Sequence, residues 1–135
     1  RDTFLRLKRF QAEEKRRRVT QLEMMITEFN RMAGELHKEI AAEEQRARIS
    51  DPSHFAYPTY ARAARNRRDN LVSSMEELKG QLDEAKLRLD EAMAEVSKAE
   101  SLEGRDRSSD RMHEVVRAAD MGANLGMMGL RAARA

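Results

Sequence analysis

Apolar residues recur along most of this chain at alternating intervals of three and four positions, and this spacing constrains the fold more than any other feature. Since a helix has about 3.6 residues per turn, such spacing places each set on one face as the a/d seam of a coiled coil. The first seam comprises Val19, Leu22, Ile26, Phe29, Ala33, Leu36 and Ile40, and the second comprises Leu71, Met75, Leu78, Leu82, Ala85, Leu89, Ala92, Val96 and Ala99. The sequence therefore predicts an all-α chain with two long helices.

The stretch 50–58 separates the two seams and holds both prolines of the chain. Proline lacks a backbone donor and biases the preceding residue away from the helical region, so this stretch predicts a break. We expect helix one over about residues 2–49, a tip at 50–58 and helix two over about 59–121. The Gly- and Met-rich residues 122–135 are expected to form a flexible tail.

The two seams can pair with each other in an antiparallel hairpin. Facing residues then have numbers that add to a constant, and the pairs from Ile40 with Leu71 to Val19 with Ala92 all add to 111. That constant centres the turn between Phe55 and Ala56, inside the break. The prediction is a long two-helix antiparallel coiled-coil hairpin that is monomeric when free. The alternative is that both seams serve a bundle of several chains.

The composition excludes several classes of protein. Charged residues make up 37% of the chain and aromatic residues 4%, which differs from a compact globular core. The absence of cysteine rules out disulfides and thiolate metal sites and is typical of a reducing compartment. No run approaches the roughly 18 apolar residues of a membrane span, so we expect a soluble protein.

The sequence contains no catalytic signature. His37, His54 and His113 are isolated, and the glycines near the C-terminus lack the lysine of a phosphate-binding loop. A pair of helices also offers no cleft in which a carboxylate could be desolvated. We expect no enzymatic activity, no cofactor and no metal.

Charge alternates along the chain. Residues 1–18 carry eight Lys or Arg against three acids, and residues 46–70 carry six against two, whereas residues 19–45 and 71–104 are acidic. If the chain folds back at the break, the acidic stretches lie side by side and the basic stretches fall at the ends.

Near the two chain ends the predicted register leaves several apolar residues without a place in the seam. Together with two arginines they form a set that we call the terminal cluster: Phe4, Arg6, Leu7, Arg9, Phe10, Met112, Val115 and Val116. Such a surface predicts a site for a partner protein. The alternative is local packing of the terminal turns.

The tip is rich in aromatic residues and arginine. Phe55, Tyr57 and Tyr60 supply three of the six aromatics, and Arg62, Arg65, Arg67 and Arg68 follow. Arginine and tyrosine are enriched at protein interfaces, and they can also stack on bases and neutralise phosphates. A third interpretation is that Phe55 and Tyr60 plug the hairpin end while the arginines are solvated. The net charge of only +2 argues against extensive phosphate contact, so no nucleic acid partner is expected.

Three stretches resemble the FliJ family of flagellar export proteins. They are the opening Arg-Asp-Thr-Phe-Leu-Arg-Leu-Lys-Arg-Phe-Gln, the segment from Ile49 to Tyr60, and Arg67-Arg68-Asp69-Asn70-Leu71. The resemblance covers roughly residues 2–120 and consists of the coiled-coil layout together with this tip.

The resemblance implies a soluble component of the flagellar type III export machinery, built like the central stalk of rotary ATPases. It would lie in the cytoplasm, peripheral to the inner membrane at the flagellar basal body. The paired helix ends would enter the hexameric export ATPase (FliI-like) and promote its assembly. The tip would engage the export-gate membrane protein (FlhA-like), and the chain would also handle export chaperones.

The resemblance also implies which residues make these contacts. The ATPase would bind the terminal cluster, and the gate protein would bind Tyr57, Tyr60, Ala64, Arg67 and Leu71. Phe55 is added from the aromatic tip, which gives the predicted gate set: Phe55, Tyr57, Tyr60, Ala64, Arg67 and Leu71. Two alternatives stay open from the residues alone. One is a basic coiled-coil arm that binds nucleic acid, and the other is a coiled-coil spacer that associates with itself.

Overall fold

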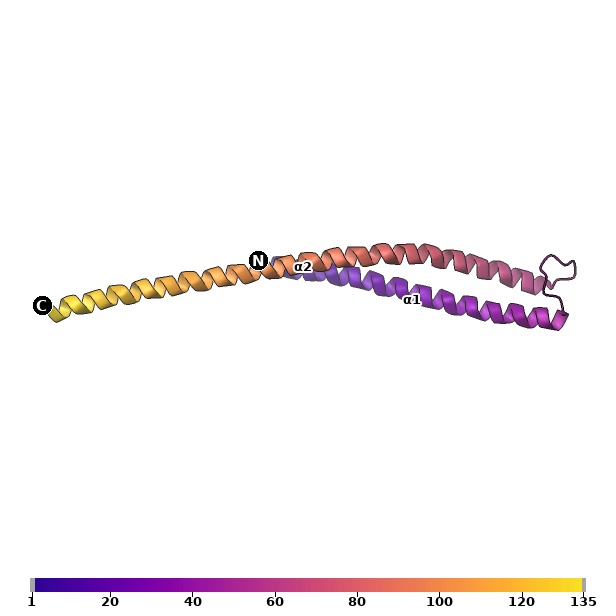
Figure 1. Ribbon diagram of the computed structural model, residues 1–135, viewed down its shortest axis with the longest axis horizontal. Coiled ribbons are helices and arrows are strands. Elements are labelled where there is room, and N and C mark those ends of the chain that lie inside the picture. The colour runs from indigo at the N-terminus through magenta and orange to yellow at the C-terminus, as the bar shows by residue number, and fades with distance from the viewer. Residues whose placement is uncertain (1, 135) are drawn as a thin grey trace. The chain divides into compact units, whose positions relative to one another are not determined.

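Two long helices account for most of the chain. A computed structural model describes the backbone of residues 2–134 and the side chains of residues 2–122. Helix α1 spans Asp2–Ala47 and helix α2 spans Thr59–Arg134, with a loop at 48–58 between them and no strand within residues 2–134 (Figure 1). The all-α prediction is confirmed, and the two helices pack against each other as expected of a helical hairpin.

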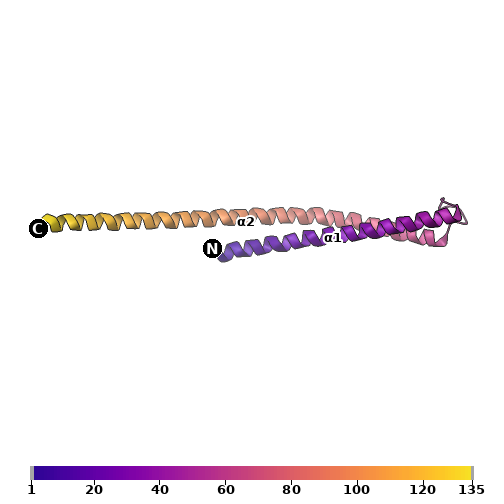
Figure 2. The same cartoon turned by 90° about the horizontal axis from the view of Figure 1, so that it is seen from below.

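The contacts divide the chain into two compact units. The hairpin unit comprises residues 11–92, and the terminal unit comprises residues 1–10 with 93–135. Within the hairpin unit, α1 and α2 lie side by side and are joined by the loop in both views (Figures 1 and 2). Over the described residues, neither helix contains a stretch long and apolar enough to cross a membrane.

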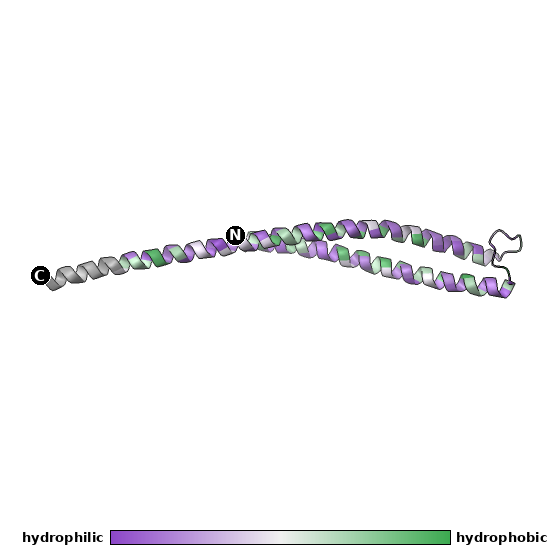
Figure 3. Cartoon of the chain, in the orientation of Figure 1, coloured by the Kyte–Doolittle hydropathy of each residue, from purple (hydrophilic) through white to green (hydrophobic). Residues whose placement is uncertain are grey.

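The apolar seams form the interior of the hairpin unit. Figure 3 shows hydrophobic residues recurring among hydrophilic ones along both helices. Leu22 is only 1% exposed, and the other buried apolar side chains of the unit are Ala12, Val19, Ala33, Leu36, Ile40, Tyr57, Ala61, Ala64, Met75 and Leu78. The burial of both seams accounts for the pairing of two helices in a chain that is 37% charged.

The register of this pairing differs from the expected one by about one heptad. Val19 was expected opposite Ala92, yet the neighbouring Arg18 hydrogen-bonds Gln81 (3.2 Å) and lines a groove with Ala85. Ala85 lies one heptad before Ala92. Residues seven positions apart on a helix are separated by about 10 Å, so the two registers are distinct.

Contacts nearer the tip show the same displacement. Leu36 and Ile40 form a buried cluster with Ala64, which lies one heptad before Leu71, and Leu71 packs against the edge of this cluster. The seam on α2 therefore begins earlier than predicted, at Ala61 and Ala64, which are both almost fully buried. The prediction failed because a heptad repeat matches itself after every seven residues, so spacing alone does not select the register.

The C-terminus of α1 has a defined cap. The amide of Arg48 donates to the carbonyl of Gln45 (3.3 Å), and the amide of Ile49 donates to the carbonyl of Glu44 (3.2 Å). These two bonds are those of a Schellman motif, which requires a left-handed residue after the last helical one. Arg48 fills that position with φ of 56°. Helix one thus ends at Ala47, two residues earlier than expected.

Helix α2 extends further than predicted. The sequence was expected to leave the helix after residue 121, but α2 reaches Arg134. The residues between and after the glycines are chiefly Ala, Leu, Met and Arg, with one Asn, and the strong helix formers among them offset the cost of the glycines. The prediction that residues 122–135 form a flexible tail is not tested, because the side chains of residues 123–135 lie outside the described part of the chain.

The terminal unit has buried apolar residues of its own on both helices. Leu5 is buried together with Val96 and Ala99. Lys8 approaches Glu95 at 3.9 Å, and Arg9 donates to Glu100 at 3.3 Å. Leu5 therefore fills the seam between the two helices of this unit.

We predict that Arg48→Gly stabilises the protein. A side chain in the left-handed region costs about 1 kcal/mol, and glycine removes that cost. Thermal unfolding followed by circular dichroism should show a higher midpoint. The matched control is Arg46→Gly, which lies inside the last turn of α1 and should lower the midpoint. A lower midpoint for Arg48→Gly would contradict the capping role.

Candidate functional site

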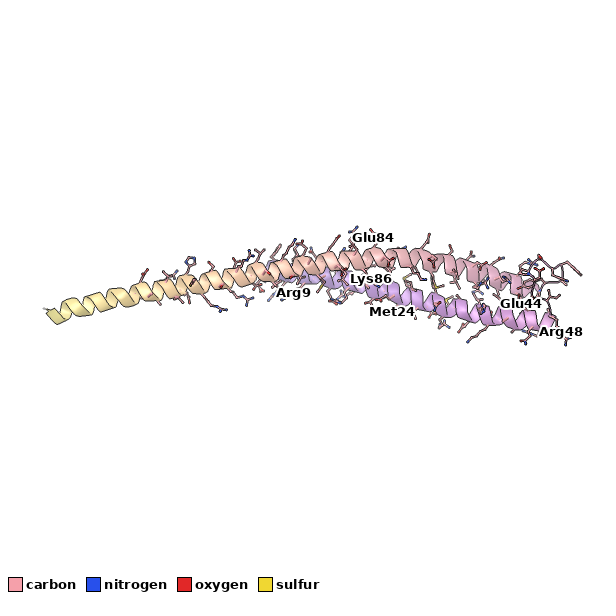
Figure 4. The ribbon with its side chains drawn as sticks, viewed as in Figure 1. Arg9, Met24, Glu44, Arg48, Glu84 and Lys86 are labelled. Atoms are coloured by element: carbon pink, nitrogen blue, oxygen red, sulfur yellow. The ribbon has the colours of Figure 1, made fainter. Side chains whose placement is uncertain are left out.

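Tyr57 lies buried at the loop end of the hairpin. Its side chain is 4% exposed, and its hydroxyl donates to Oε2 of Glu44 at 2.9 Å. Arg65 approaches the same carboxylate oxygen at 3.5 Å, and the guanidinium of Arg62 lies 5.3 Å from the centre of the Tyr57 ring. Figure 4 shows Glu44 near the end of α1, beside the start of α2. A tyrosine buried this way joins the loop to α1.

Three members of the predicted gate set serve the hairpin itself. Tyr57 and Ala64 are buried, and Leu71 is half-buried against Leu36 and Ile40. Small residues at Ala61 and Ala64 allow the two helices to approach closely. Neither Tyr57 nor Ala64 is therefore available to a partner in this structure. The interpretation of Phe55 and Tyr60 as a plug of the hairpin end was wrong, because both are more than half exposed and Tyr57 is the buried aromatic.

Tyr60 and Arg67 remain accessible on one side of the tip. Tyr60 is 54% exposed, and its hydroxyl donates to Oε2 of Glu39 at 2.8 Å. Both residues line a groove with Glu35, Glu39, Met32 and Leu36. The hydrogen bond to Glu39 raises the pKa of Tyr60, and the negative charge of Glu39 adds to this effect. This surface is thus acidic on α1 and carries an aromatic and a cation on α2.

We predict that Tyr60 titrates above the usual tyrosine pKa of about 10. The chain has no tryptophan and two tyrosines, so Tyr57→Phe leaves Tyr60 as the single phenol that absorbs near 295 nm on ionisation. Glu39→Gln in that background should lower the measured pKa of Tyr60, because the tyrosinate that forms on ionisation is no longer repelled by a neighbouring carboxylate.

The same shift has a defined effect on stability. The pKa of Tyr60 is higher in the folded state than in the unfolded chain. The bond to Glu39 therefore contributes its full stabilisation of the fold at pH values below the pKa that Tyr60 has in the unfolded chain. The stabilisation is lost as the pH rises through the folded value. An unchanged absorbance titration in Glu39→Gln would show that Glu39 is not the cause.

Phe55 is the most exposed aromatic side chain among the described residues, at 96%. Its ring stacks on His54, with centroids 4.8 Å apart and planes 22° from parallel. Of the predicted gate set, Phe55 is thus the member that offers most of its side chain to a partner.

The loop around Phe55 is held by hydrogen bonds that run through its own residues. The Oδ1 of Asp51 accepts from the amide of Ser53 (3.0 Å) and from its hydroxyl (2.8 Å). These bonds lower the pKa of Asp51, the amide of Ser53 being the larger cause. The carbonyl of Asp51 accepts from the amide of His54, and that of His54 accepts from the amide of Tyr57. The loop is therefore a series of turns that ends at the buried Tyr57.

The apolar members of the terminal cluster are about half exposed or more. Phe4 is the least exposed of the six at 48%, and Met112 is the most exposed at 66%. They form two groups. Phe4 lines a groove with Ala99, Leu102, Glu103 and Asp106, whereas Met112 and Val116 line a surface with Ser108, Ser109 and His113 on α2 alone.

The two arginines of the terminal cluster form exposed ion pairs. Arg6 lies 3.3 Å from Asp2 and Arg9 lies 3.3 Å from Glu100, with side chains 78% and 58% exposed. Exposed pairs of this kind are worth about 0–1 kcal/mol, so both cations can exchange these partners for others.

The sequence did not indicate Glu103, whose Oε2 is buried and has no hydrogen-bond partner within the described residues.

The described residues hold no group of three His, Asp or Glu side chains arranged to bind a metal ion. In comparisons with known proteins, no family model, curated protein or solved structure matches this chain. A function must therefore be argued from the surfaces that the described residues expose.

Proposed function

We propose that this chain is a coupling stalk of the flagellar type III export apparatus, of the FliJ type. The terminal unit binds the hexameric export ATPase and promotes its assembly and activity. The tip engages the export-gate membrane protein, and the chain also handles export chaperones. It acts in the cytoplasm, at the inner membrane beneath the flagellar basal body.

The observation that carries the proposal is the exposure of the terminal cluster beside a seam that is already filled. Leu5, Val96 and Ala99 are buried between the helices of the terminal unit, while Phe4, Leu7 and Phe10 are about half exposed or more. Large apolar residues that a fold exposes together are typical of an interface. Arg6 and Arg9 add positive charge to the same turns, as expected for an acidic partner surface.

The two alternative functions receive less support. Arg65 pairs with Glu44 and Arg68 pairs with Asp69, so two of the four tip arginines have intramolecular acidic partners. Binding along a nucleic acid backbone would call for free cations. A self-associating spacer would need its seam for other copies, and in the hairpin unit that seam is buried within one chain.

We predict that the purified protein stimulates ATP hydrolysis by the export ATPase of the same organism. Combining Phe4→Ala, Leu7→Ala and Phe10→Ala should raise the concentration for half-maximal stimulation about tenfold or more, because exposed apolar anchors dominate interface energies. Alanine favours helix, so circular dichroism should show the same helicity.

The matched control combines Met24→Ala with Leu87→Ala. Both residues are more than half exposed and lie in the hairpin unit, outside either proposed interface. This variant should stimulate the ATPase like the original protein. Equal stimulation by the triple variant would rule out the terminal cluster as the ATPase-binding surface, and no stimulation by the original protein would contradict the proposed function.

A further inference from the structure

The apex of the tip loop exposes a single large apolar side chain. Phe55 is 96% exposed, whereas Tyr57 two residues later is 4% exposed. Fully exposed phenylalanine gains nothing from folding, since its apolar area stays in water. The folded hairpin therefore does not account for Phe55, whose ring stacks on the neighbouring ring of His54 while the side chain stays almost fully exposed.

The loop is built to hold Phe55 in one place. Before it, the Schellman motif at Arg48 and Ile49 fixes how the chain leaves α1. After it, the amide of Ala56 donates to Nδ1 of His54 at 3.0 Å, and Tyr57 is anchored to Glu44. A side chain presented by an ordered loop loses little conformational freedom on binding, which favours affinity.

Positive charge flanks this aromatic residue. Arg48 precedes the loop turns and Arg62 follows them, stacked over the Tyr57 ring. Neither arginine has an ion pair among the described side chains, whereas Asp51 is occupied by its bonds to Ser53. The loop thus combines one apolar apex with two available cations. A complementary surface has an apolar pocket with carboxylates at its rim.

We propose that the tip docks as a preformed plug, with Phe55 filling an apolar pocket of the export-gate protein and Arg48 and Arg62 facing carboxylates at the rim of that pocket. This inference rests on the proposed function for the identity of the partner. Phe55, Arg48 and Arg62 then make the contacts with the gate protein, whereas the buried Tyr57 and Ala64 support the loop.

A protein pocket accounts for this tip better than a lipid surface does. Even one myristoyl chain gives only marginal membrane binding, and a single phenylalanine buries far less apolar area than such a chain. A closely fitting pocket can instead gain most of an interface's affinity from one aromatic anchor.

The test is calorimetric titration of the cytosolic part of the gate protein with the full chain. We expect Phe55→Ala to weaken binding about 30-fold or more, the loss typical of an aromatic hot spot. Arg48→Gly combined with Arg62→Gln should weaken binding several-fold and reduce its dependence on salt. Leu87→Ala removes another large exposed apolar side chain, 53% exposed, from α2 in the hairpin unit and should bind like the original chain.

Each outcome decides the proposal. Equal affinity for Phe55→Ala overturns it and leaves the stalk function in place. Absence of binding by the original chain also overturns it, and the separate ATPase assay then shows whether the stalk function survives. Pelleting with vesicles rich in anionic phospholipid gives the last outcome: binding that disappears in Phe55→Ala would assign Phe55 to a membrane and overturn the pocket.

Discussion

The packing of Tyr57, Ala61 and Ala64 against the end of α1 is the interaction on which the rest of the hairpin depends. Two heptad seams match equally well in registers that differ by seven residues. The tip removes this ambiguity, because Tyr57 reaches Glu44 and Ala64 joins the cluster of Leu36 and Ile40. Ala61 and Ala64 are almost fully buried at this place, so the tip holds the two seams in one register.

The register decides which residues stay available for binding. At the tip, the packing buries Tyr57 and leaves Phe55 outside. In the terminal unit, Leu5 fills the seam, so Phe4, Leu7 and Phe10 are not needed there. Both candidate surfaces therefore consist of residues that the helix pairing leaves over. This accounts for a chain that can be stable by itself and still carry large exposed apolar groups.

The sequence predicted the helices well because their spacing is a property of each helix alone. It predicted the break from two prolines for the same reason. The register, the burial of Tyr57 and the left-handed Arg48 could not be read, since each depends on contacts between segments far apart in the chain. Tyr57 and Phe55 look equivalent in sequence, and the burial of Tyr57 with its hydrogen bond to Glu44 separates their roles. The predicted functional partners remain proposals.

The most direct test of this account is disulfide formation between paired cysteines, because the chain has none of its own. A disulfide requires Cα atoms about 4.4–6.8 Å apart, and neighbouring registers differ by about 10 Å along the helix. One variant combines Val19→Cys with Ala85→Cys, and the other combines Val19→Cys with Ala92→Cys. The account predicts rapid intramolecular cross-linking of the first pair and little of the second. Preferential cross-linking of Val19 to Ala92 positions would contradict it.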